Sequence, residues 1–174
     1  MTPDVVRLRA SLDALAGLMT ELELTLVDDP AWSEPSDTSY LNEKDRTNPD
    51  LVANVEAMTA THALISWFGR YREGFVGLWR GPNATALDQA PIVRLDSEGQ
   101  YELVATTVGD FLAIAADQDR FAEHRRSLVD AGFTVAASRK LIWQTLDTLD
   151  DPNAYRHELY NAARGRRGLP PISD

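Results

Sequence analysis

The spacing of apolar residues changes twice along this chain, and these two changes restrict the fold more than any other feature of the sequence. Before residue 62, apolar side chains recur at the three- and four-residue spacing of amphipathic helices. Between about residues 62 and 108 they alternate, or form short runs bounded by glycine, as strands do. The helical spacing then returns. Because helices come first, strands next and helices last, we expect an α+β fold rather than repeated βαβ units.

The middle section predicts a central, mainly antiparallel sheet of about four strands. The expected strands are residues 63–69, 75–79, 91–95 and 101–105. The links within the first and second pairs are short and contain glycine, which favours hairpins. We therefore expect this sheet to be flanked by the N-terminal and C-terminal helices.

Cap residues and apolar spacing predict the helices. Thr2 and Pro3 begin one long helix that extends to about Leu22, in which Gly17 marks close packing against a neighbour. A second helix, 49–61, has an apolar face of Leu51, Val52, Val55 and Met58. Further helices are expected after Thr107 and at 117–131, 137–149 and 152–165, followed by a frayed tail at 166–174.

An acidic segment without helical or alternating spacing separates the first two helices, from residue 27 to 48. Structureless connections of this length are uncommon within domains and are often functional or mobile. The alternative is that Trp32, Tyr40 and Leu41 fix the segment to the rest of the protein. We find neither an internal repeat nor a linker, so one domain, 1–174, is expected.

The formal net charge of −10 disfavours nucleic acid as a partner, because phosphate binding needs clustered Lys and Arg side chains. The surface should prefer a basic partner, unless the acidity serves only to keep the protein in solution. No apolar stretch is long enough to span a membrane, and the N-terminus lacks the pattern of a signal peptide. We therefore expect a soluble, cytoplasmic protein that does not bind membranes.

The sequence contains none of the common catalytic motifs. There is no cysteine, which excludes disulfides, thiolate zinc sites and cysteine nucleophiles. His62, His124 and His157 lack the paired spacing of metal ligands, and surface or capping roles are expected for them. No nucleophile elbow and no phosphate-binding glycine loop occurs. We expect a protein that is not an enzyme, without metal or cofactor; the alternative is a small hydrolase whose carboxylates meet only in three dimensions.

The region from about residue 51 to 115 has an order of parts that resembles a known superfamily. The parts are a helix around Met58, the strand Phe75-Val76-Gly77-Leu78-Trp79 with Gly81 at its end, the strand and turn of residues 91–99, and a helix start from Thr107 that ends Asp110-Phe111-Leu112. This order is similar to the SUKH superfamily, which groups bacterial toxin-immunity proteins with relatives of the yeast cell-wall assembly regulator. The resemblance covers a little over a third of the chain.

The resemblance implies a non-catalytic protein that neutralises a toxin domain by binding it; the alternative within the same superfamily is a regulatory or scaffolding module for an endogenous partner. Core packing is the ordinary role for Phe68 and Phe75, whereas an indole edge that must stay hydrated suggests a cleft or interface for Trp79. The residues expected to bind a basic protein partner are the aromatic anchors Trp79 and Trp32 and the acids Asp28, Asp29, Glu34 and Asp37.

Overall fold

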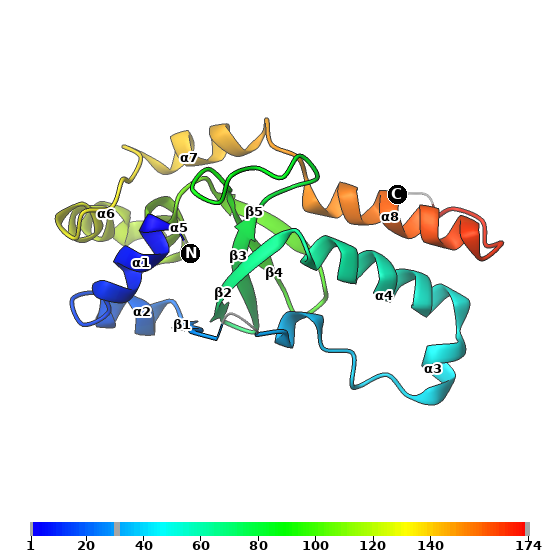
Figure 1. Ribbon diagram of the computed structural model, residues 1–174. Coiled ribbons are helices and arrows are strands. Elements are labelled where there is room, and N and C mark those ends of the chain that lie inside the picture. The colour runs from blue at the N-terminus through cyan, green and yellow to red at the C-terminus, as the bar shows by residue number, and fades with distance from the viewer. Residues whose placement is uncertain (1, 30–31, 173–174) are drawn as a thin grey trace.

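The strands form a meander in which each strand pairs with the next one along the chain (Figure 1). The computed structural model describes residues 2–29 and 32–172. All four strand pairs are antiparallel, and the strands are β1 (Leu24–Leu26), β2 (Ile65–Tyr71), β3 (Gly74–Trp79), β4 (Ile92–Leu95) and β5 (Tyr101–Ala105). The expected α+β class is confirmed. The expected strands correspond to β2–β5, and the short β1 was not predicted.

The described residues contain eight α-helices: α1 (Pro3–Ala10), α2 (Ala16–Glu21), α3 (Glu43–Thr47), α4 (Pro49–His62), α5 (Val108–Ala115), α6 (Phe121–Asp130), α7 (Arg139–Leu146) and α8 (Pro152–Arg166). The side chains of Thr2, Asn48, Thr107 and Asp151 cap α1, α4, α5 and α8 by accepting hydrogen bonds from backbone N–H groups. None of the helices in the described ranges has an apolar stretch long enough to cross a bilayer.

The long N-terminal helix that the sequence predicts is interrupted. The N–H of Ser11 bonds to the carbonyls of Arg7 and Leu8, at 3.0 and 3.1 Å, and ends α1, and α2 begins only after Leu15. The expectation of close packing at Gly17 is also wrong, since a Cβ atom at this position would meet no atom within 4 Å. Leu8 and Leu15, on either side of the interruption, are nonetheless both buried. Leu12, which the helical spacing placed on the same face, lies within the interruption and is 38% exposed.

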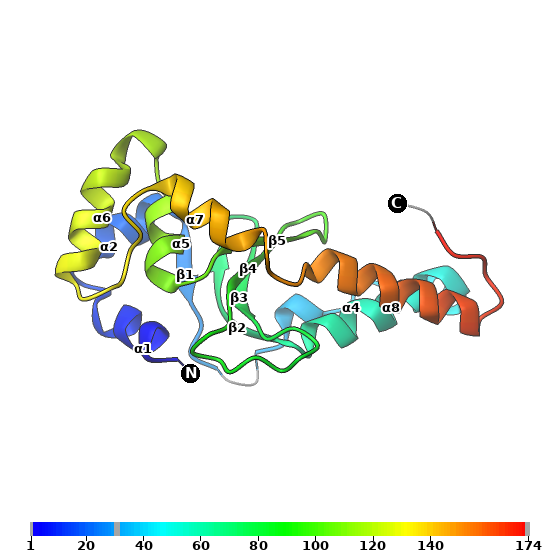
Figure 2. The ribbon, with the colours of Figure 1, turned by 90° about the horizontal axis from the view of Figure 1, so that it is seen from above.

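The two faces of the sheet carry cores of different size. The larger core lies between the sheet and the helices α1, α2, α5 and α6, which gather at one side of the molecule (Figures 1 and 2). The smaller core, on the other face, consists of Ile65, Trp79, Val93, Leu95 and Tyr101. Phe68 and Tyr71, three positions apart in β2, both pack in the larger core because the strand has a bulge at Phe68, whereas Trp67 packs against the smaller core.

Helices α4 and α8 pack along one another and extend away from the sheet (Figure 2). The buried face of α4 is not the predicted one, because Leu51, Val52, Val55 and Met58 are only half-buried. Ala53, Ala57 and Thr61 are buried instead, as is Ala163 of α8. Small side chains let two helices approach closely, and a pattern search that looks for large apolar residues does not detect such a face.

Residues 167–172 fold back on α8. The N–H of Ile172 donates to the Asn161 side chain at 2.9 Å, the N–H of Leu169 donates to the carbonyl of Arg164, and the Arg167 guanidinium pairs with Glu56. These contacts hold most of the segment for which a frayed tail was expected. Residues 173–174 of that segment lie outside the described residues.

Candidate functional site

The acidic loop, defined as residues 27–48, runs from the edge of the sheet to the start of α4. It contains six acids and two bases. Its described parts, 27–29 and 32–48, include one turn of 3₁₀ helix (Glu34–Ser36) and the short α3. The loop is therefore partly regular, and side chains from the sheet and from α4 hold it at several points.

The first point of attachment is Trp32. Its ring packs edge-on against Phe75 of β3, with a distance of 5.5 Å between ring centroids. Its indole N–H donates to the Glu34 carboxylate at 3.1 Å, and the same carboxylate pairs with Arg70 of β2. Three groups from two strands and the loop thus position the indole, and Glu34 is held by these contacts rather than free to meet a partner.

The second point of attachment joins Ser36 to His62. The Ser36 hydroxyl lies 2.8 Å from Nδ1 of His62, whose ring is 4% exposed and packs edge-on against Trp67 and Tyr101. Burial, and secondly the positive charge of Arg156, lower the pKa of His62 to about 4. The surface or capping role expected for histidines is wrong for His62 and also for His124, which is likewise 4% exposed.

The far end of the acidic loop is organised by its own side chains. Asn42 and Asp45 form a reciprocal capping box at the start of α3. The Arg46 guanidinium donates to the carbonyls of Thr38 and Leu41, at 3.2 and 3.1 Å. These bonds leave Tyr40 at the surface with 72% of its area exposed.

Asp37 presents a charged carboxylate beside Tyr40. It accepts hydrogen bonds from the N–H and the hydroxyl of Ser39, at 2.8 and 2.9 Å, and these bonds lower the pKa of Asp37. The carboxylate is exposed and ionised at neutral pH. Asp37 is therefore an exposed carboxylate in a turn of the acidic loop.

A hollow of about 320 Å³, here called the edge slot, lies between the start of the acidic loop and β2. It is lined by Val5, Arg9, Val27, Asp28, Asp29, Trp32, Ile65, Ser66, Trp67, Phe68, Leu78 and Leu87. Asp28, Asp29 and Trp32 were predicted as binding residues, and all three line this hollow. Asp28 already pairs there with the guanidinium of Arg9. Trp67 was not singled out for binding; its indole N–H is buried and has no hydrogen-bond partner among the described residues.

Trp79 does not belong to this surface. It is 2% exposed in the smaller core, and its indole N–H donates to the carbonyl of Asp150 at 3.0 Å. The expectation that its polar edge stays hydrated is therefore wrong, because a backbone carbonyl replaces water. Phe68 is buried at 4%, as expected for a core residue, and Phe75 packs half-buried against Trp32 and Trp67.

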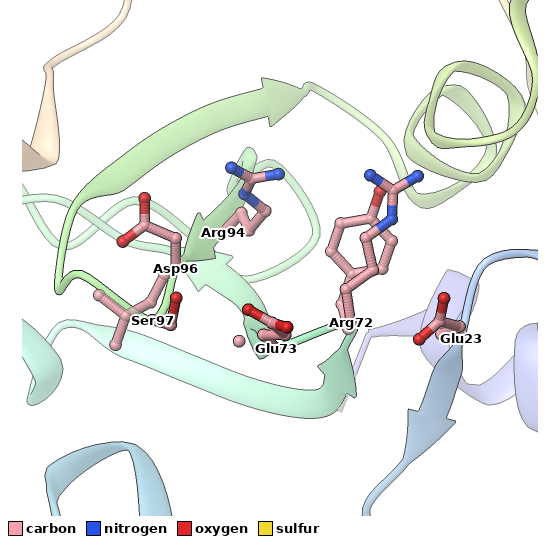
Figure 3. A pocket seen from close by; sticks show the side chains of 9 residues that line it. Glu23, Arg72, Glu73, Arg94, Asp96 and Ser97 are labelled. Carbon is pink, nitrogen blue, oxygen red and sulfur yellow. The ribbon is translucent and has the colours of Figure 1, made fainter.

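A second hollow, of about 360 Å³, lies at the ends of the β2–β3 and β4–β5 hairpins (Figure 3). The carboxylates of Glu23, Glu73 and Asp96 and the guanidinium groups of Arg72 and Arg94 line it, and the two guanidinium groups point to the same side. Three of these five charged groups already have hydrogen-bond or ion-pair partners within the protein.

In this second hollow, Asp96 accepts the N–H groups of Glu98 and Gln100 in its turn, Arg94 pairs with Glu102, and Arg72 donates to the carbonyl of Ala115. None of the predicted binding residues lies there.

Within the described residues, no group of three or more His, Asp or Glu side chains is arranged to hold a metal ion. Comparison with known proteins gives no match, whether with protein families, with curated proteins or with solved structures.

Proposed function

We propose that this protein binds a basic protein partner through the acidic loop and the adjoining edge slot, and that it acts as an immunity-type protein that occludes a toxin domain. The observation that carries the proposal is the attachment of the acidic loop. Trp32, Ser36 and the capping box of α3 fix it to the sheet, to α4 and to itself, although these contacts contribute little to either core.

A loop that is ordered before binding loses less conformational entropy when a partner arrives. The side chains that attach the acidic loop contact residues of the sheet and of α4, namely Phe75, Arg70 and His62. Asp37 and Tyr40, in contrast, are exposed to solvent. This arrangement suits a binding surface better than a spacer, because a spacer needs only to connect its ends.

Charge determines the class of partner that we propose. Asp28, Asp29 and Asp37 are exposed, although Asp28 pairs with Arg9, and the chain as a whole carries a net charge of −10. The negative electrostatic field of these charges accelerates association with a basic protein surface and repels nucleic acid. An exposed tyrosine such as Tyr40 supplies contact area at a small entropic cost.

The resemblance to the SUKH superfamily supports a binding role of the kind that its immunity proteins have. It rests on the order helix, strand, glycine-containing strand, strand, helix, and α4, β2, β3, β4 and α5 occur in that order. The same resemblance includes regulatory modules that dock an endogenous partner, and the surface described above would serve either role.

The proposal is tested by co-expressing the chain with the product of the gene directly upstream in its genome. An immunity role predicts that the neighbour is a large multi-domain toxin, that its toxic domain copurifies with this chain, and that co-expression restores growth. An endogenous partner recovered from the native host, with a metabolic gene as neighbour, would favour the regulatory role. Turnover of a small compound by the purified protein, abolished by changing Glu73 or Asp96 to its amide, would favour a hydrolase.

A further inference from the structure

We propose that the second hollow, at the ends of the β2–β3 and β4–β5 hairpins, binds a free α-amino acid. The carboxylate of the ligand contacts Arg72 and Arg94, and its ammonium group contacts Glu23 and Glu73. No lining residue of this hollow belongs to the acidic loop, so the inference goes beyond the proposed function and does not depend on it. It is carried by opposite charges that line one hollow without pairing with one another.

The second hollow has charges of both signs. The three carboxylates of Glu23, Glu73 and Asp96 exceed the two guanidinium groups of Arg72 and Arg94 by one negative charge. Among the described residues, neither guanidinium forms an ion pair with any of these three carboxylates; Arg94 pairs with a carboxylate outside the hollow instead. A simple anion would be repelled by the carboxylates, and a simple cation by the guanidinium groups. A zwitterion meets complementary charge at both of its ends.

Both guanidinium groups keep donors for a ligand. A guanidinium has five N–H groups. Arg72 uses Nη2, at 3.3 Å from the carbonyl oxygen of Ala115, and Arg94 uses Nη2, at 3.4 Å from the Glu102 carboxylate. Both contacts are longer than the usual hydrogen-bond length of about 2.7–3.2 Å. Nε of Arg94 is buried and has no partner in the described part of the chain.

The direction of the two guanidinium groups suits one shared carboxylate. Figure 3 shows that Arg72 and Arg94 point to the same side of the hollow, with the carboxylates of Glu23 and Glu73 below them in this view. Guanidinium donors match the two oxygens of a carboxylate in geometry and in charge. The ammonium group of an α-amino acid is bonded one carbon away from its carboxylate, so a single small ligand presents both charges to this surface.

Glu23 and Glu73 are available to receive an ammonium group. Both residues are exposed, and neither carboxylate has a hydrogen-bond or ion-pair partner within the described ranges. Asp96 differs from them, because its Oδ1 accepts the N–H groups of Glu98 and Gln100, both at 2.9 Å. Asp96 therefore adds negative charge to the second hollow, while Glu23 and Glu73 offer unoccupied acceptors.

The backbone of the second hollow adopts a conformation that favours glycine at two positions where the sequence has charged residues. Glu23 and Arg72 each have a φ of 51°, in the left-handed region. The N–H of Arg72 donates to the carbonyl of Glu23 at 3.2 Å, so the two strained residues are neighbours. Glycine would relieve the strain but would remove one guanidinium and one carboxylate from the hollow. Strain of this kind is concentrated at binding sites.

Tyr71 gives the second hollow a rigid wall. The residue is 4% exposed, and the guanidinium carbon of Arg72 lies 5.2 Å from the centroid of its ring. Burial raises the pKa of the Tyr71 hydroxyl, which therefore stays protonated at neutral pH. The volume of about 360 Å³ is at the low end of the range of about 300–1,000 Å³ for small-molecule pockets. An amino acid suits this size better than a large cofactor.

The test titrates L-alanine, L-serine, L-leucine and L-glutamine into the isotope-labelled protein and follows the backbone amides by NMR. At least one of these amino acids should give saturable shifts of the amides of Arg72, Glu73 and Asp96. Two blocked forms of the tightest ligand then identify the groups that are recognised. N-acetylation removes the ammonium charge, amidation of the carboxyl group removes the negative charge, and each should weaken binding at least about tenfold.

Two protein variants assign the ends of the ligand. Arg94→Gln should weaken binding at least about fivefold and reduce the loss caused by amidation, because the carboxylate has then lost one of its partners. Glu73→Gln, in an exposed turn where the fold tolerates it, should weaken binding about threefold or more and reduce the loss caused by N-acetylation. The exposed controls Arg126→Gln on α6 and Glu43→Gln on α3 should change affinity by less than about 1.5-fold.

Several outcomes would overturn the proposal. One is that none of the four amino acids gives a saturable shift, and another is that the shifting amides lie outside the second hollow. An N-acetylated ligand that binds as tightly as the free amino acid would make this a simple anion site. An amidated ligand that binds as tightly would make it a simple cation site. Binding of the toxin domain is measured separately, so failure here leaves the proposed function intact.

Discussion

The hydroxyl of Ser36 lies 2.8 Å from Nδ1 of the buried His62 and thereby fastens the acidic loop to the end of α4. The attachment joins the proposed binding surface to the hydrophobic interior, because the same imidazole contacts Trp67 and Tyr101. The shape of the loop should therefore depend on the protonation of one side chain.

The stability of the protein should fall as the pH drops from about 6.5 toward 4. The pKa of His62 is lowered in the folded protein, so the fold favours the neutral imidazole. This contribution is complete above the unfolded value of 6.5 and is lost as the pH falls through the folded value of about 4. It amounts to at most about 3 kcal/mol, of which about 2 kcal/mol should be lost by pH 5. Urea unfolding at a series of pH values measures it.

Substitution identifies the group that titrates. His62→Gln keeps a polar group near Ser36 but removes the titration, so the free energy of unfolding should change much less between pH 6.5 and 5 than in the unmodified protein. His157→Gln, on α8, should retain the pH dependence. Equal slopes for His62→Gln and the unmodified protein would show that another group is responsible.

Trp79 should be essential for stability and not for binding. Trp79→Phe removes part of a ring that is 2% exposed and leaves the Asp150 carbonyl without its donor, which should cost about 2–3 kcal/mol. Trp143→Phe, at a site that is 42% exposed, should change stability by less than about 0.5 kcal/mol. Chemical denaturation compares the two, and similar small losses would contradict the placement of Trp79 in the core.

Two helical glycines should respond to alanine with opposite signs. At Gly17 a Cβ atom would meet nothing within 4 Å, so Gly17→Ala should stabilise the protein by up to about 1 kcal/mol. At Gly109 a Cβ atom would lie 2.3 Å from the backbone carbonyl oxygen of Thr134, so Gly109→Ala should cost about 2 kcal/mol or more. The melting temperatures of the two variants, compared with that of the unmodified protein, test both predictions. A loss of stability at Gly17 would indicate packing that the structure does not contain.

Sequence patterns predicted the parts of the fold that depend on local spacing. The alternation in residues 63–69 and 75–79, and the caps Thr2 and Thr107, lie in segments whose structure is set by their own residues. β1 was missed because three residues carry too little alternation to distinguish a strand from a loop. The buried alanine face of α4 was missed because its packing depends on α8, about a hundred residues further along the chain.

In the candidate site, too, residues within one segment were predicted, whereas contacts between distant segments were missed. Asp28, Asp29 and Trp32 were found from the composition of one segment, and they lie together. Trp79 was misplaced because the acceptor for its indole N–H is Asp150, a backbone carbonyl that no residue pattern identifies.

The central claim is that an acidic, preformed surface recruits a basic protein. Its most direct test is the rate of association with the upstream toxin domain, measured by stopped flow at increasing salt for the unmodified protein and for the triple variant Asp28→Asn, Asp29→Asn and Asp37→Asn. We predict that the rate for the unmodified protein falls at least about tenfold between low and high salt, and that the variant starts slower with a flatter dependence. Rates that depend neither on salt nor on these three carboxylates would contradict the account.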